Sequence, residues 1–262
     1  MDNNISVWSM DSLLNSLYRQ EVVPSILKFS ARTINDYKGP HMTKVLCIDS
    51  SSRSSTSVTR QLTEAYLSRF RSANPAAQIV HRDLLAENVP YVSEAAIATL
   101  YTPADQRTAE MEALYKESVV FADELVAADV IVLGAPMYNF SVPAVLKAYI
   151  DMIVLPGKTF EYDGGAPVAL LAGMNKKVIV LTASGGNYDQ LPYKAADFLE
   201  PYLRTVLGFI GIDDVTFVKV QGHDAALVQE QTVQALARIN QLVGQLLLFD
   251  KEAVADAVNV AN

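Results

Sequence analysis

A chain of 262 residues with 50% hydrophobic content is long enough to bury a sizeable core, in one large domain or two small ones. Its net charge of −8 argues against a nucleic-acid-binding surface, because contacts with phosphates require clustered Lys and Arg. The single cysteine, Cys47, excludes an internal disulfide framework, and the three histidines lie too far apart in the sequence to predict a metal site.

Residues 1–41 differ from the remainder, because they contain helical fragments but no strand pattern. The junction Gly39-Pro40-His41-Met42 resembles the scar of a cleaved expression tag joined to an initiator Met. We therefore expect residues 1–41 to be a flexible extension, a tag remnant or the product of a start codon assigned too early. We find neither a secretory signal nor a run of ~18 apolar residues. With the lone cysteine, this favours a protein of the reducing cytoplasm.

From Met42 onward, short apolar strands alternate with amphipathic helices, a pattern that indicates a parallel sheet covered on both faces. Five strands without an internal repeat favour a flavodoxin-like, doubly wound α/β domain over residues 42–249, followed by a C-terminal tail at 250–262. The predicted strands are 44–49, 78–83, 130–133, 177–182 and 215–220, with a hairpin arm at 158–163. The predicted helices are 57–72, 105–127, 144–153, 192–207 and 225–249, and the insert 84–104 holds at most one short helix.

Three predicted loops follow the carboxyl ends of strands, where open α/β sheets bind ligands. The first contains seven Ser or Thr among the eight residues from Ser50 to Ser57 and leads into a helix N-terminus, which favours an anion. It lacks the glycine patterns of dinucleotide and nucleoside-triphosphate loops. Many neutral donors without a lysine suit a terminal monophosphate ester. The structural alternative is an ordinary helix cap with a polar loop.

The other two loops predict a flat ligand. Residues 135–143, APMYNFSVP, carry Met, Tyr and Phe side chains that a purely structural loop would not need. Residues 182–188, TASGGNY, contain paired glycines that allow the backbone to approach a ligand closely. Together the three loops supply a phosphate end, an aromatic wall and N–H donors for the edge of a ring. This combination points to FMN.

The same stretches resemble a known family. From Met42 to about Leu247 the chain is similar to the FMN-dependent NADH azoreductases, also called FMN-dependent NADH:quinone oxidoreductases. The order and spacing of the matching motifs agree with that family. They are Lys-Val-Leu at 44–46 with the serine-rich loop, Pro-Met-Tyr-Asn-Phe at 136–140, Gly-Lys-Thr-Phe-Glu-Tyr at 157–162, Ser-Gly-Gly at 184–186 and Leu-Gly-Phe-Ile-Gly at 207–211.

The resemblance implies a role for residues of each loop. The FMN phosphate and ribityl chain would be held by Ser51, Ser57, Val58 and Thr59. The isoalloxazine ring would be bordered by Met137, Tyr138, Asn139 and Phe140. The pyrimidine side of the ring would be lined by Ala183, Ser184, Gly185 and Gly186. Phe160 and Tyr162 would lie near the ring or the substrate pocket, contributed by either subunit of a homodimer.

Two positions depart from the family pattern. Val58 stands where a polar residue is common, so only its backbone N–H could serve the cofactor. Ala183-Ser184 stands where Ser-Arg is often found, which could weaken cofactor contacts or change the preference for an electron donor. Backbone groups supply much of FMN binding, so the expectation of FMN stands.

The resemblance further implies an enzyme with one FMN per subunit, in which hydride passes from NADH to the flavin N5 and then, in a ping-pong cycle, to a quinone. Aromatic azo compounds would be cleaved to amines, and electrophilic quinones would be detoxified. No side chain is expected to be an obligatory acid or base. His223 is predicted to lie on the surface, and Tyr138 either donates a hydrogen bond or packs. A flavodoxin-type electron carrier, a protein that has lost its flavin, the use of NADPH and nitroaromatic acceptors remain alternatives.

Overall fold

The computed structural model describes residues 43–87, 89–190 and 192–260, with the backbone alone from 247 onward. The chain divides into a unit Met42–Lys251 and a second unit made of Met1–His41 and Glu252–Asn262. The fold described below is that of the first unit. The predicted extension 1–41 lies outside the described residues.

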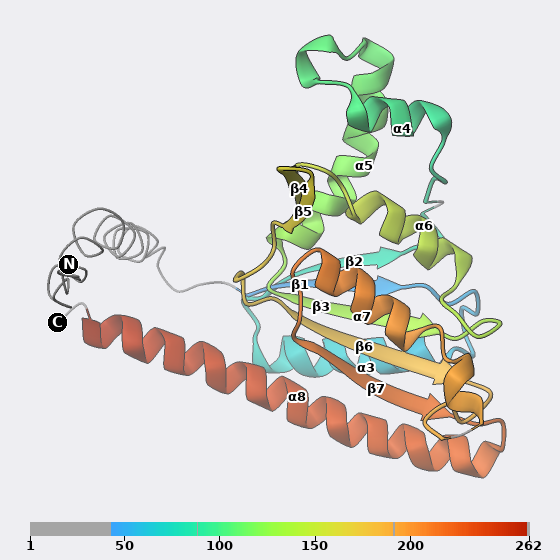
Figure 1. Cartoon of the computed structure of the whole chain (residues 1–262). Coiled ribbons are helices and arrows are strands. Elements are labelled where there is room, and N and C mark those ends of the chain that lie inside the picture. The colour runs from blue at the N-terminus through green and yellow to red at the C-terminus, as the bar shows by residue number, and fades with distance from the viewer. Residues whose placement is uncertain (1–42, 88, 191, 261–262) are drawn as a thin grey trace, which may run out of the picture. The chain divides into compact units, whose positions relative to one another are not determined.

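A parallel five-stranded sheet forms the centre of this unit, as predicted (Figure 1). Its strands run in the order β2-β1-β3-β6-β7. The chain leaves β1 toward one edge to form β2, then crosses to the other side for β3, β6 and β7. The carboxyl ends of β1 and β3 therefore diverge at a topological switch point, where sheets of this kind bind ligands. The strands are β1 Lys44–Asp49, β2 Gln78–Asp83, β3 Val130–Pro136, β6 Lys177–Ser184 and β7 Val215–Gln221.

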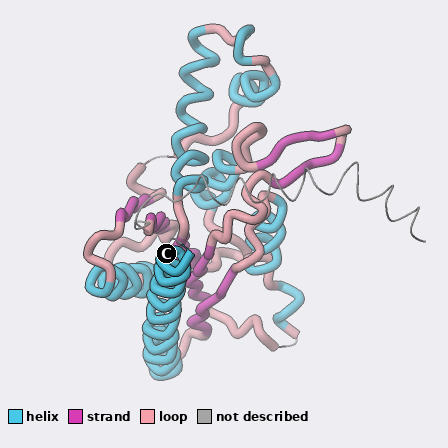
Figure 2. The backbone as a smooth tube through the Cα atoms, turned by 90° about the vertical axis from the view of Figure 1, so that its left-hand side faces the viewer, coloured by secondary structure: helices cyan, strands magenta, loops and turns pink. Residues whose placement is uncertain are grey.

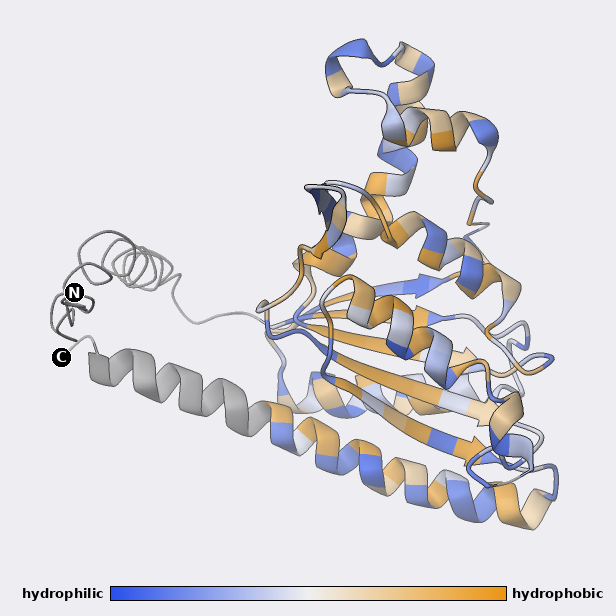
Figure 3. Ribbon diagram, viewed as in Figure 1, coloured by the Kyte–Doolittle hydropathy of each residue, from blue (hydrophilic) through white to orange (hydrophobic). Residues whose placement is uncertain are grey.

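The position of each strand follows from its residues. All seven residues of β3 are buried, as expected for an apolar run at the centre of a sheet covered on both faces. The strand β2 lies at an edge, and its pattern of exposed and half-buried residues reflects its mixed sequence, QIVHRD. Figure 3 shows the apolar residues concentrated on the inner strands and on the inward faces of the helices.

Helices cover both faces of the sheet, and β1 shows how the two cores are separated. Val45 and Cys47 point toward α3 and α8, whereas Leu46 and Ile48 point toward α5 and α6. Cys47 is fully buried, and burial raises the pKa of its thiol so that it stays protonated. The covering helices are α3 Val58–Ala73, α5 Ala109–Ala127, α6 Ala144–Ile153, α7 Glu200–Phe209 and α8 Ala225–Val260.

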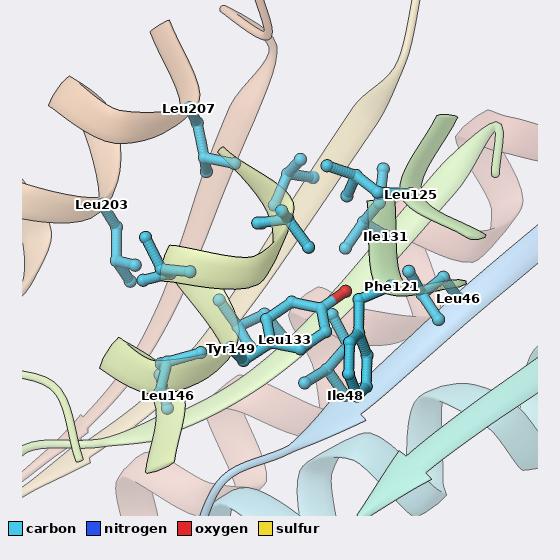
Figure 4. Packing of buried hydrophobic residues seen from close by; sticks show 14 of the residues in the cluster. Leu46, Ile48, Phe121, Leu125, Ile131, Leu133, Leu146, Tyr149, Leu203 and Leu207 are labelled. Atoms are coloured by element: carbon cyan, nitrogen blue, oxygen red, sulfur yellow. The ribbon is translucent and has the colours of Figure 1, made fainter. Parts of the chain in front are cut away.

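The core beneath α5, α6 and α7 is built around aromatic side chains (Figure 4). Tyr149 of α6 and Phe121 of α5 meet edge to face, with ring centroids 5.6 Å apart. Leu146, Leu203 and Leu207 complete the same cluster. This packing fixes α6, and with it the carboxyl end of the 135–143 loop that precedes the helix.

Two features interrupt the alternation of strands and helices. The insert 84–104 contains one short helix, α4 Glu94–Tyr101, followed by the 3-10 turn η1 Ala104–Gln106. The predicted hairpin arm is confirmed as β4 Phe160–Asp163, which pairs antiparallel with β5 Ala166–Ala169 (Figure 2). No helix within the described ranges is both long enough and apolar enough to cross a membrane.

Three helix boundaries differ from the prediction by more than two residues. The predicted helix 192–207 is a 3-10 turn, η2 Tyr193–Ala196, followed by α7 from Glu200. Asp197 Oδ1 accepts the N–H groups of Leu199 and Glu200 at 2.9 and 3.0 Å, which starts a new helix. The helix α5 begins at Ala109 because Thr108 caps it. The predicted tail begins within α8, which continues to Val260 because no Gly or Pro follows Gly244.

Candidate cofactor site

Loops at the carboxyl ends of β1, β3, β6 and β7 enclose a cleft of about 540 Å³, a size in the range of small-molecule sites. Nine of the twelve predicted cofactor residues line it. They are Ser51, Ser57, Val58, Thr59, Met137, Tyr138, Ala183, Ser184 and Gly185. Sequence reasoning missed the remaining lining residues, which are Arg53, Thr56, Pro136, Val220, Gly222, His223 and Val228.

The serine-rich loop is held in place by the N-terminus of α3. Ser57 Oγ accepts the N–H of Arg60 at 3.3 Å as the helix N-cap and lies 3.0 Å from Thr59 Oγ1. The cap anticipated as the structural alternative is therefore present. Ser57 and Thr59 also line the cleft, so the same hydroxyls stand at a helix N-terminus, where an anion is stabilised. A phosphate role for them stays a prediction.

Arg60 ties this loop to the edge strand β2. Its guanidinium donates to the Ser51 carbonyl at 2.9 Å and to both carboxylate oxygens of Asp83 at 2.7 and 2.8 Å. The Arg60 guanidinium holds the pKa of Asp83 below its usual range. The loop is thus fixed by its own protein contacts, which orients its donors before a ligand binds.

A second support, which the sequence did not reveal, lies beneath the loop. Asp49 ends β1, and its carboxylate is 5% exposed, accepts Thr63 Oγ1 at 2.9 Å and lies 2.8 Å from His81 Nε2. Cys47, Asp49 and His81 each place a potential metal-ligand atom within 4.8 Å of the other two. Both Asp49 oxygens are engaged by Thr63 and His81, and the Arg60 guanidinium lies 3.9 Å away, so the cluster acts as a hydrogen-bonded support for the loop.

The Asp49–His81 contact predicts a pH-dependent stability. The hydrogen bond to Asp49 raises the pKa of His81, with smaller contributions from the charges of Asp83 and Glu64, against a lowering by partial burial. The stabilisation is therefore complete below about pH 6.5 and is lost as pH rises through the raised folded-state pKa. Because His81 is 43% exposed, we expect at most about 1 kcal/mol. Urea unfolding should show wild type losing this stability between pH 6 and 9 relative to His81→Gln. Parallel pH profiles would contradict the assignment.

The loop after β3 makes a tight turn beside the serine-rich loop. Tyr138 and Ser141 exchange backbone hydrogen bonds of 3.0 and 3.2 Å around the turn. The Tyr138 hydroxyl lies 2.8 Å from Ser52 Oγ and accepts the Ser52 N–H at 3.2 Å. Partial burial raises the pKa of Tyr138, but the hydrogen bonds from Ser51 and Ser52 outweigh it, so the net shift is downward. Tyr138 therefore joins the two loops by hydrogen bonds as well as by packing.

The two central residues of this turn, Asn139 and Phe140, have φ of 48° and 74°. Asn tolerates the left-handed region, but Phe rarely occupies it, because its Cβ approaches the carbonyl oxygen. The Phe140 side chain is also 51% exposed, so core packing does not explain the strain. Strained residues of this kind cluster at binding sites, and Phe140 stands beside the cleft without lining it.

We expect the strain at Phe140 to reverse the usual order of stability, in which an Ala variant is more stable than a Gly variant. Phe140→Gly relieves the left-handed strain whereas Phe140→Ala keeps it, so the Gly variant should be more stable by about 1 kcal/mol. Urea unfolding of the cofactor-free proteins measures the difference. The matched control is Val120, which is 47% exposed on α5. There the Ala variant should be more stable than the Gly variant by about 1 kcal/mol. The same order at both positions would refute the strain.

Backbone hydrogen bonds fix the start of the loop after β6, and Gly185 is left open to the cleft. The Ala183 carbonyl accepts the N–H of Met137 at 2.8 Å, and the Ser184 carbonyl accepts that of Gly222 at 2.8 Å. A Cβ added at Gly185 would meet no atom within 4 Å, so this residue faces open space in the cleft. A Cβ at Gly186 would instead lie 3.1 Å from the Tyr188 ring.

The structure does not bring the two predicted substrate residues to this cleft within one chain. Phe160 is buried, and its ring centroid lies 5.0 Å from that of Phe209. Tyr162 is 59% exposed on the β4–β5 hairpin. A role in a substrate pocket stays a prediction and requires the partner subunit. His223 is exposed, as predicted, but it lies at the rim of the cleft.

The lining of the cleft suits FMN. One end gathers hydroxyl groups at a helix N-terminus, as a phosphate requires. The lining also includes the apolar side chains of Val58, Met137 and Val220, which suit a flat apolar ring. The lining contains Arg53 and His223 but no carboxylate, so an anionic group meets no repulsion from the residues around it.

Comparisons with known proteins agree with this geometry. Residues 43–243 match the family with a flavodoxin-like fold. An FMN-dependent NADH:quinone oxidoreductase of Herminiimonas arsenicoxydans is 43% identical, over 79% of this chain and 99% of its own. An FMN-dependent NADH:quinone oxidoreductase 2 of Pseudomonas fluorescens strain Pf0-1 is 44% identical, over 77% of this chain and 100% of its own.

A solved azoreductase structure from Bacillus anthracis strain Sterne superimposes with a TM-score of 0.69 at 29% identity, covering 76% of this chain and 100% of its own. The family match at residues 43–243 extends over the described sheet and its loops. The chain therefore belongs to the flavodoxin-like family and, within it, to the group of the FMN-dependent NADH:quinone oxidoreductases.

Proposed function

We propose that this chain is an FMN-dependent NADH:quinone oxidoreductase that also cleaves aromatic azo compounds to amines. The observation that carries the proposal is that hydroxyls at the N-terminus of α3 and residues of the loops 135–143 and 182–188 line the same cleft. Its relatives are oxidoreductases of this kind, and the similar solved structure is an azoreductase. A role in removing electrophilic quinones follows from that activity.

The residues of the cleft divide the work of binding. Ser51, Ser57 and Thr59, with the first N–H groups of α3, bind the phosphate end. Val58 contributes its backbone N–H. The loop of Met137, Tyr138, Asn139 and Phe140 orients the ring from one side.

The loop after β6 completes the site. The backbone N–H groups of Gly185 and Gly186 donate to the polar edge of the ring and stabilise negative charge that develops there. When bound, FMN supplies two-electron transfer between NADH and the acceptor. Donor and acceptor use the same site in turn, which gives a ping-pong cycle. Protons come from water, and we assign no side chain the role of acid or base.

We further propose a homodimer with one FMN per subunit. Apolar side chains remain exposed on and beside the β4–β5 hairpin, where Tyr162, Val168 and Phe209 are 59%, 40% and 39% accessible. An exposed apolar patch of this kind is typical of a subunit interface. Pairing there would bring Tyr162 toward the partner's cleft. Light scattering should give twice the chain mass for wild type and the chain mass for Tyr162→Arg. A monomeric wild type would contradict the proposal. We place the enzyme in the cytoplasm, which suits its one free thiol.

Initial-rate kinetics test the proposed activity. With NADH and benzoquinone both varied, the double-reciprocal lines should be parallel, as a ping-pong cycle requires. The same protein should cleave an aromatic azo dye at two NADH per dye, because each azo bond takes four electrons. Intersecting lines would reject the proposal that donor and acceptor alternate at one site. If the protein reduced neither benzoquinone nor the azo dye, the proposed enzymatic activity would be rejected. Repeating the series with NADPH measures the donor preference.

A further inference from the structure

The residue Tyr188 stands beside the cleft in a position that the proposed function does not yet use. Its ring lies against Gly186, where an added Cβ would be 3.1 Å from Tyr188 Cε2. It also meets Phe140 edge to face, with ring centroids 6.4 Å apart and planes at 79°. Phe140 comes from the loop after β3 and Tyr188 from the loop after β6, so the two rings meet across the pair of loops that would border the isoalloxazine ring.

The edge strand β7 fixes the backbone at Tyr188. Gln221 Oε1 accepts the Tyr188 N–H at 3.0 Å, and the Gln221 backbone N–H donates to Gln231 Oε1 at 2.6 Å. Gln221 is itself buried. A buried acceptor on a strand whose own backbone is held leaves the Tyr188 amide little freedom to move.

A second contact from β7 holds the next residue of the loop. Lys219 Nζ lies 2.6 Å from Asp189 Oδ1 and 2.7 Å from Glu200 Oε2. Burial lowers the pKa of Lys219, but these two carboxylates outweigh it and raise the pKa overall, so the bridge stays charged. Lys219 and Gln221 are two residues apart and therefore project from the same face of the strand. They hold Asp189 and Tyr188 together.

A further backbone hydrogen bond joins the segment between β6 and α7 to the turn that contains Phe140. The Phe198 N–H donates to the Phe140 carbonyl at 3.0 Å. The loop is thus anchored at Tyr188, Asp189 and Phe198. Because these contacts order the loop when the protein folds, little conformational entropy is lost when a ligand binds. This favours a site that must present a ring in one orientation.

We propose that Tyr188 is a specificity-determining residue. With Phe140 it forms the aromatic wall against which the flat ring of the donor or acceptor packs, and Lys219 and Gln221 are the positioning residues that hold it there. The inference rests on the proposed function, because it assumes a flavin in the cleft. An aromatic pair of this kind contributes enough that its loss should weaken binding of a flat ring about tenfold.

The test uses the full chain loaded with FMN and a probe that does not react with it. Calorimetry measures the dissociation constant of NAD+, and hydrogen exchange measures the protection of the amides of residues 186–190. The variants are Tyr188→Ala and Tyr188→Phe for the ring, and Gln221→Leu and Gln221→Glu for the acceptor. Lys177→Met is the distant control, because it removes an ion pair with Asp214 at the opposite end of β6, away from the loop.

Tyr188→Ala should raise the dissociation constant of NAD+ about tenfold, and raise KM for NADH and naphthoquinone to the same extent, with kcat changed less than about twofold. Tyr188→Phe, Gln221→Glu and Lys177→Met should match wild type. Gln221→Leu should speed exchange at residues 186–190 about tenfold and weaken NAD+ binding. An unchanged dissociation constant in Tyr188→Ala, or loss of FMN from it, would overturn the proposal. A wild type that takes up no FMN would instead overturn the proposed function itself.

Discussion

Replacing Gly185 by valine is expected to weaken FMN binding about 100-fold while leaving the fold intact. Gly185 lines the cleft, and a Cβ at this position would meet no protein atom within 4 Å. Its φ lies outside the left-handed region, so a branched residue fits the backbone. The valine methyl groups would therefore occupy space that the cofactor needs, and forcing extra methyl groups into a filled site costs about 1–3 kcal/mol. Quenching of FMN fluorescence measures the dissociation constant, and urea unfolding of the cofactor-free protein measures the stability.

A graded series and a distant control make this result specific. Gly185→Ala should fall between wild type and Gly185→Val, since it adds one methyl group to the cleft. Gly244→Ala on the exposed side of α8 should leave FMN binding unchanged and raise the stability by about 0.5–1 kcal/mol. Normal FMN affinity in Gly185→Val would place the cofactor elsewhere. A large loss of stability in that variant would mean that Gly185 is needed for the fold.

Replacing Gly211 by alanine is expected to give the largest loss of stability. Gly211 follows α7 at φ 94°, and an added Cβ would lie 2.4 Å from Ala172 N and 2.9 Å from Ala172 Cα. Backbone atoms cannot move aside as a flexible side chain can. The left-handed strain and the overpacking together should cost about 3 kcal/mol, which lowers Tm by roughly 10 °C in a domain of this size. Urea and thermal unfolding of the cofactor-free protein measure both quantities.

Gly173 provides the matched control for this prediction. It has a φ of 75°, but a Cβ there would meet nothing within 4 Å. Gly173→Ala therefore adds the backbone strain alone and should cost about 1 kcal/mol. The difference between the two variants measures the close approach between the end of α7 and Ala172. Equal losses in the two variants would show that conformation, and not contact, makes Gly211 necessary.

The sequence was sufficient for the sheet because its strands are short apolar runs with polar loops after them. The strands β1 and β2 begin and end where the sequence places them. The predicted start of the helix at 192–207 was wrong because Asp197, a polar residue in a helical pattern, accepts the N–H groups at the start of a new helix. Apolar periodicity does not register such a side-chain hydrogen bond.

The candidate site was predictable in part, and the difference has a physical cause. Ser51 and Met137 follow strand ends, and Ser57 caps the helix that follows the first loop, so the topology brings them together. His223 lines the same cleft from the last strand, but a lone histidine after a strand has no pattern to mark it. The contact of Asp49 with His81 depends on the pairing of β1 with β2. The φ of Phe140 depends on the tight turn in which this residue lies. None of these is encoded in local spacing.

The measurement that tests the central claim most directly is the absorbance spectrum of the purified protein during anaerobic addition of NADH and then benzoquinone. We predict flavin bands that bleach with one equivalent of NADH per subunit and return with one equivalent of benzoquinone. Bound flavin that NADH leaves oxidised would contradict the enzyme and favour an electron carrier. A protein that shows no flavin bands, even after incubation with FMN, would contradict the cofactor assignment.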